Sequence, residues 1–187
     1  TLASSSAASD VYKRQVQISA DAVSLANALR GDNKVQGNWG EFVLEKLLED
    51  SGLVNGREYT TQVALKDEMG KRRNPDVVIH LPEGRDIVID AKVSLVDYER
   101  YFYAEDDDTK SKCLAAHLAS LKAHVRGLSG KDYESLEGVN SLDFVLIFIP
   151  VESAFMVALD QSPEMMKDAY DRGIILVSPS TLMVTLR

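Results

Sequence analysis

Two short runs of β-branched residues, separated by a proline–glycine turn, constrain the fold of this chain most strongly. The runs cover residues 76–81 and 86–91, and Pro82–Gly84 between them is typical of a short hairpin loop. Antiparallel pairing across this loop would place Asp76, at the start of the first run, beside Asp90, near the end of the second. The sequence therefore predicts two neighbouring carboxylates at one end of a hairpin.

The remaining hydrophobic patterns indicate helices and further strands around this hairpin. Residues 59–66 alternate as a strand does, which extends the hairpin to a three-stranded meander. The expected order is a helix at 39–48, strands at 59–66, 76–81 and 86–91, a helix at 93–126, a strand at 142–149, helices starting near 150 and 162, a strand at 173–177 and a helix from 179. This mixed order predicts an α/β protein whose sheet carries helices on both faces.

One domain is expected for a chain of 187 residues. Residues 1–15 are small and polar, which indicates a disordered tail or a gene-assembly scar. Residues 16–34 suit a short packing helix or the end of a longer coiled coil, and residues 35–187 form the domain. The single cysteine, Cys113, excludes an internal disulfide, and no apolar run is long enough to cross a bilayer. A cytoplasmic location and no membrane contact are expected for this fragment.

The residues at the strand ends have the chemistry of a metal-dependent hydrolase. Close carboxylates repel each other, and a Mg²⁺ or Mn²⁺ ion held by Asp76 and Asp90 would relieve that repulsion. Such an ion polarises a phosphate and lowers the pKa of a bound water. Lys92 would orient that water or offset developing charge, and Glu41 would add an oxygen if its helix packs over the strand ends. The pattern points to cleavage of phosphodiesters.

A structural explanation competes with this interpretation. An aspartate at a strand end is also common turn chemistry, and the triplet Asp-x-Lys arises by chance. The position of Asp90 favours function, because it ends an apolar run on an expected central strand, where an unpaired charge is costly. The net charge of −8 lowers the odds of DNA binding, which depends on basic side chains, and leaves local basic patches to provide it.

Secondary candidates lie near these residues. Lys71, Arg72 and Arg73 could contact phosphates beside the cleavage site or form a solvated turn. Glu152 follows a proline at a strand-to-helix junction, where capping of the helix is the simpler role. His117 and His124 lie seven residues apart on one predicted helix, without the i, i+4 spacing of a metal-binding pair, which indicates partly buried packing residues.

Five motifs in order give the chain a family resemblance. They are Gly37–Glu41 (GNWGE), Pro75–Asp76, Ile89–Lys92 (IDAK), Phe148–Glu152 (FIPVE) and Ser178–Leu182 (SPSTL). Together they resemble the RmuC family of bacterial DNA recombination proteins, which is assigned to the PD-(D/E)XK nuclease-like superfamily. The resemblance covers residues from about 37 to the end of the chain.

This resemblance implies a restriction-endonuclease-like α/β/α sandwich with a central mixed sheet of about five strands. It also implies a Mg²⁺-dependent deoxyribonuclease in which Asp76 and Asp90 are metal ligands, Lys92 is the catalytic lysine and Glu41 is an additional acidic ligand. Family members carry an N-terminal anchor to the inner membrane, a coiled coil that would form homo-oligomers, and a helical region after the core. We therefore expect a core fragment, truncated at its C-terminus. The alternative is a silent module that binds DNA or a partner on a nuclease fold.

Overall fold

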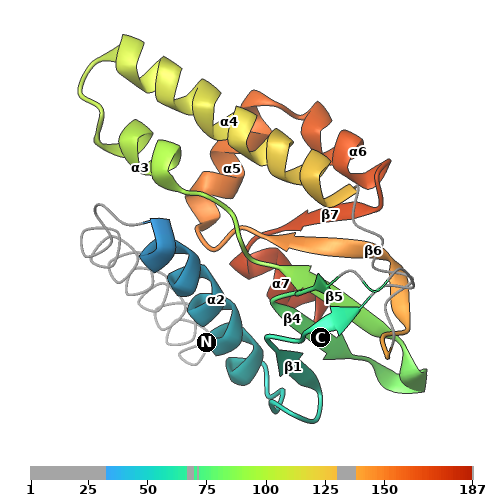
Figure 1. The fold of residues 1–187 in the computed structure, drawn as a ribbon. Helices are drawn as coiled ribbons and strands as arrows, with labels where there is room; N and C mark the ends of the chain where they lie inside the picture. Colours follow the sequence, from blue (N-terminus) through green and yellow to red (C-terminus); the bar gives the residue numbers. More distant parts are fainter. Residues whose placement is uncertain (1–32, 67–69, 71, 130–137, 187) are drawn as a thin grey trace, which may run out of the picture.

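The structure, a computed structural model, describes residues 33–66, 70, 72–129 and 138–186 (Figure 1). The helices of these residues are α2 (Asn33–Asp50), α3 (Val96–Tyr103), α4 (Asp107–Ser129), α5 (Glu152–Gln161), α6 (Glu164–Tyr170), α7 (Pro179–Thr185) and a 3₁₀ turn, η1 (Pro82–Gly84). The strands are β1 (Tyr59–Thr61), β2 (Leu65–Lys66), β3 (Arg72–Arg73), β4 (Val77–His80), β5 (Asp86–Asp90), β6 (Ser141–Phe148) and β7 (Ile174–Val177). The predicted tail at 1–15 and nearly all of the predicted helix at 16–34 lie outside these residues.

A five-stranded mixed sheet in the order β1-β4-β5-β6-β7 organises the chain. β1, β4 and β5 form the predicted antiparallel meander, while β5, β6 and β7 run parallel. In the hairpin, Val77 pairs with Ile89 and Val78 pairs with Val88. The predicted pairing of the two strands is confirmed, and the same register continued one step beyond the ladder places Asp76 opposite Asp90.

Helices cover both faces of the sheet, which makes the domain an α/β/α sandwich (Figure 1). On one face, Val78 and Val88 pack in a core with apolar residues of α4, α5 and α6. On the other face, Val77 and Ile89 pack in a second core with residues of α2 and α7. β5 is the middle strand, and all five of its residues are buried. A strand covered on both faces is expected to be almost entirely apolar, so its two terminal aspartates require explanation.

Two features of α2 fix its position beside the sheet. The helix ends in a Schellman motif, in which Gly52 has φ +86° and the Leu53 N–H donates to the Leu48 carbonyl over 3.1 Å. Near its middle, Gly40 lies so close to the chain after β5 that an added Cβ would lie 3.2 Å from the Ala91 carbonyl oxygen. Glycine at this position allows α2 to approach the end of β5.

Two sequence-based expectations were wrong in detail. The helix expected at 93–126 is two helices, because Ala104 is extended and Asp106 caps a new helix by accepting the Thr109 N–H over 2.8 Å. The strand expected at 59–66 is interrupted at Gln62, whose φ of 54° is left-handed, and its second half forms the small β2–β3 ladder. Among the described helices, none has both the length and the apolar character needed to span a membrane.

Candidate active site at the end of β5

The candidate site begins with the two aspartates that lie just beyond the Val77–Ile89 pair, at the end of the β4–β5 ladder. Both carboxylates are buried, Asp76 at 6% exposure and Asp90 at 1%. Asp76 follows Pro75 and directly precedes β4, and Asp90 is the last residue of β5. Pro75 favours extended backbone at Asn74, the residue that precedes the proline. Buried charges are expected to be paired or strongly hydrogen-bonded, and both residues meet this requirement.

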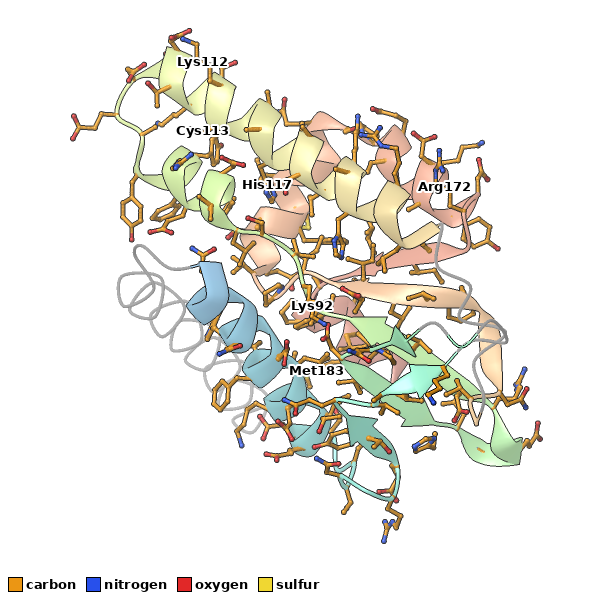
Figure 2. The ribbon with its side chains drawn as sticks, viewed as in Figure 1. Lys92, Lys112, Cys113, His117, Arg172 and Met183 are labelled. Carbon is orange, nitrogen blue, oxygen red and sulfur yellow. The ribbon has the colours of Figure 1, made fainter. Side chains whose placement is uncertain are left out.

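Asp76 binds the chain that leaves β5. Its Oδ2 accepts the Ala91 N–H over 2.8 Å, and its Oδ1 forms an ion pair with Nζ of Lys92. Figure 2 shows Lys92 where the chain leaves β5 at the centre of the molecule. The side chain of Lys92 is half exposed, so this ion pair lies at the boundary between the buried strand ends and solvent.

Asp90 is held by donors from two elements. Its Oδ1 accepts the backbone N–H of Lys92 over 3.2 Å and lies 3.1 Å from Nε2 of His124, on α4. The pleat accounts for this contact, because Asp90 shares its face of β5 with Val88, which packs in the core on the α4 side.

Glu41 approaches the same group from α2, one residue after the close contact of Gly40. Burial, followed by the negative charge of Asp76, raises the pKa of Glu41 above its ordinary value of 4.5. Asp90 raises it further, while Lys92 acts in the opposite direction. Glu41 therefore lies within electrostatic reach of all three residues with which the sequence grouped it.

Lys92 is held in its charged form. Burial alone would lower the pKa of Lys92, but the hydrogen bond and charge of Asp76, with smaller contributions from Asp90 and Glu41, raise the pKa above 10.5. At neutral pH this side chain is an ammonium that donates protons in hydrogen bonds and cannot accept one. Three carboxylates thus act on one fixed positive charge, and Asp76 contacts it directly.

The donor set suits a hard divalent cation without forming a complete protein cage. Within the described part of the chain, no group of three or more His, Cys, Asp or Glu side chains is arranged to hold an ion. Mg²⁺ is usually bound by one or two carboxylates together with waters and substrate phosphates, so two buried carboxylates with a surplus of negative charge are compatible with it. Asp76 and Asp90 are the residues that would hold such an ion, and Glu41, the third predicted ligand, acts on them through its charge.

Glu152 is the first residue of α5, and its carboxylate forms hydrogen bonds with the start of α7. Its carboxylate accepts the Ser178 hydroxyl over 2.9 Å, the Ser180 hydroxyl over 2.7 Å and the Ser180 N–H over 3.1 Å. These contacts link the ends of β6 and β7, so Glu152 caps the first turn of α7, whereas the sequence predicted that it caps the helix in which it lies. Lys71 lies outside the described residues; Arg72 and Arg73 form β3, and their side chains are not described.

The two histidines of α4 separate in the structure. His117 is fully buried and its Nε2 lies 3.1 Å from the Ala154 carbonyl oxygen, whereas His124 reaches Asp90 (Figure 2 labels His117). The sequence pattern treated both as packing residues and missed the contact with Asp90. The available signal was that His124 falls between Leu121, Val125 and Leu128, whose spacing indicates the face of α4 that packs on the sheet.

Comparisons with known proteins agree on one family. The model of the RmuC family matches residues 6–187. A protein named DNA recombination protein RmuC homolog from Vibrio cholerae is 55% identical over 171 residues, which is 91% of this chain and 33% of that protein. A homolog of the same name from Yersinia pestis is 56% identical over 178 residues, 95% of this chain and 37% of that protein.

A third relative, the DNA recombination protein RmuC of Escherichia coli K12, is 54% identical over 178 residues, which is 95% of this chain and 38% of that protein. The chain therefore spans about a third of the length of the curated relatives it matches. No solved structure matches the chain significantly.

Proposed function

This chain belongs to the RmuC family, and we propose on that premise that it is the core of a DNA recombination protein that hydrolyses DNA phosphodiesters with a divalent metal ion. The observation that carries the proposal is the meeting of Asp76, Asp90, Lys92 and Glu41 at the end of β5. DNA as the substrate is supported by the names of the relatives, which are DNA recombination proteins.

The charge balance of the group supports a cation. Three acidic side chains, Asp76, Asp90 and Glu41, face the one positive charge of Lys92, and the pKa of Glu41 is raised first by burial and then by the charge of Asp76. A bound Mg²⁺ or Mn²⁺ would supply Lewis acidity and a water of lowered pKa at neutral pH. Asp76 and Asp90 would hold the ion together with waters and phosphate oxygens, and Glu41 would add an oxygen ligand only if its side chain moved towards the ion on binding.

Lys92 contributes as a fixed cation. Because its pKa is raised, the ammonium stays protonated at neutral pH and cannot serve as the general base. The Lys92 side chain is half exposed, and its Nζ can donate hydrogen bonds to a phosphate oxygen or to an attacking water. It would also offset negative charge that develops on the phosphate in the transition state. In the absence of an ion, Asp76 holds the ammonium at the end of β5.

The decisive experiment is a cleavage assay on single-stranded, duplex and branched DNA with Mn²⁺, in which the purified protein is compared with Asp90→Asn. Cleavage that depends on Mn²⁺ and disappears in the variant supports the proposal. Absence of cleavage above the Asp90→Asn background on all three substrates would refute it. Salt-dependent DNA binding that persists in Asp90→Asn without any cleavage would select the alternative of a silent DNA-binding module.

A further inference from the structure

α4 brings His124 to the candidate site from the face of the sheet opposite to Glu41. Nε2 of His124 lies 3.1 Å from Oδ1 of Asp90. The side chain of His124 is 23% exposed to solvent, whereas that of Asp90 is only 2% exposed. A partly solvated imidazole therefore contacts a buried carboxylate that would bind the metal ion.

The other end of β5 carries a second histidine–aspartate pair with a different setting. Nδ1 of His80 lies 2.7 Å from Oδ1 of Asp86, and its Nε2 lies 2.9 Å from Oγ1 of Thr60. Oδ2 of Asp86 accepts the Asn140 N–H over 2.9 Å. This network links β1, β4, β5 and the residue before β6, so its role is structural. His80 shares a face with Asp76 but lies four residues along the strand, about 13 Å away.

We infer that His124 is a positioning residue for Asp90, which fixes the carboxylate in the orientation that binds the divalent ion; this inference rests on the proposed function. An imidazole with hydrogen on Nε2 donates to Oδ1, the same oxygen that accepts the Lys92 N–H. Two donors from two elements then restrict rotation of the Asp90 side chain. Loss of such a partner of a metal ligand typically weakens metal binding by about 10-fold to 100-fold.

The test is Mn²⁺ binding measured by calorimetry without DNA, so that the readout does not depend on catalysis. His124→Leu removes the donor, and we expect it to weaken Mn²⁺ binding by about 10-fold or more. His124→Gln keeps an N–H donor at a similar distance from the helix and should remain within about threefold of wild type. His80→Leu makes the same change in the pair at the other end of β5 and should leave Mn²⁺ affinity unchanged.

The outcomes separate this inference from the proposed function. If Asp90→Asn abolishes Mn²⁺ binding while His124→Leu binds as wild type does, the positioning role is wrong and the proposed metal site stands. If wild type shows no Mn²⁺ binding that Asp90→Asn removes, the proposed metal site is wrong and the inference falls with it. Circular dichroism checks that each variant folds, and His124→Ala replaces His124→Leu if the leucine variant does not fold. If His124→Gln weakens Mn²⁺ binding as much as His124→Leu does, the positioning role is also wrong.

Discussion

The ammonium of Lys92 forms an ion pair with the carboxylate of Asp76, sixteen positions away in the chain, at the end of the β4–β5 hairpin. The same carboxylate accepts the N–H of Ala91, so it binds both the backbone and the side chain of the segment that leaves β5. This pairing explains how a buried aspartate and a half-exposed lysine can coexist beside two further carboxylates. It also means that a divalent ion and Lys92 would compete for Asp76.

Replacement of Lys92 by methionine should separate catalysis from metal binding. We expect Lys92→Met to lower the rate of DNA cleavage by about 100-fold or more, because a positioned donor is lost. Mn²⁺ affinity should be equal to or higher than that of wild type, because Asp76 is released from its ion pair. Calorimetry and a cleavage assay measure both; equal losses of affinity and rate would contradict the role given to Lys92.

The ion pair should also influence stability in a pH-dependent way. Because the pKa of Lys92 is raised above 10.5 in the folded state, its contribution is fully present below that pH and is lost as the pH rises through the folded-state pKa. With the side chain half exposed, we expect Lys92→Met to cost only about 1 kcal/mol at neutral pH. Urea unfolding at pH 8 and above pH 11 measures the difference, which should shrink at the higher pH.

Glu41→Gln should raise thermal stability in the absence of divalent ions. The folded-state pKa of Glu41 lies above 4.5, so its ionisation opposes folding as the pH rises above that value. At pH 7.5 we expect the variant to melt about 2 °C higher than wild type, and near pH 4 the difference should vanish because Glu41 is then protonated in both states. Scanning calorimetry at the two pH values tests this; a variant that melts lower at pH 7.5 would contradict a destabilising effect of burial and of Asp76 on the ionised Glu41.

Glu152 should matter for stability and have no effect on the metal. We expect Glu152→Ala to cost about 1–3 kcal/mol, because it removes the shared acceptor of Ser178 and Ser180. Glu152→Gln, which keeps an acceptor, should cost less. Mn²⁺ affinity should be the same in wild type and in both variants, and a 10-fold loss in Glu152→Gln would instead assign Glu152 a role in the metal site.

Contacts between residues close in the chain could be predicted from the sequence, and contacts between distant residues could not. The position of Asp76 opposite Asp90 follows from the antiparallel pairing of two adjacent runs across a short loop, so local pattern alone predicts the register of the hairpin. The contact of His124 with Asp90 joins residues 34 positions apart and depends on how α4 packs across the sheet, which helical periodicity does not specify. The division of the expected helix at 93–126 depends on one cap at Asp106, which accepts the Thr109 N–H and which helical periodicity does not reveal.

Gly40 should be required for the approach of α2, and Gly37 on the same helix provides a matched control. A Cβ at position 40 would lie 3.2 Å from the Ala91 carbonyl oxygen and 3.6 Å from Pro150, whereas at position 37 no atom of the described residues lies within 4 Å. We expect Gly40→Ala to cost about 1–3 kcal/mol through overpacking. Gly37→Ala should gain about 0.5–1 kcal/mol, because alanine favours the helix.

The same pair of variants tests whether α2 positions Glu41 for function. Gly40→Ala should displace α2 from the end of β5, so we expect it to weaken Mn²⁺ binding together with stability, while Gly37→Ala should leave Mn²⁺ affinity unchanged. Urea unfolding and Mn²⁺ calorimetry on both proteins measure the two effects. If Gly40→Ala is as stable as Gly37→Ala, α2 does not approach the Ala91 carbonyl as closely as described. If Gly40→Ala is destabilised but binds Mn²⁺ as wild type does, Glu41 contributes nothing to the metal, because its helix can move without consequence for the ion.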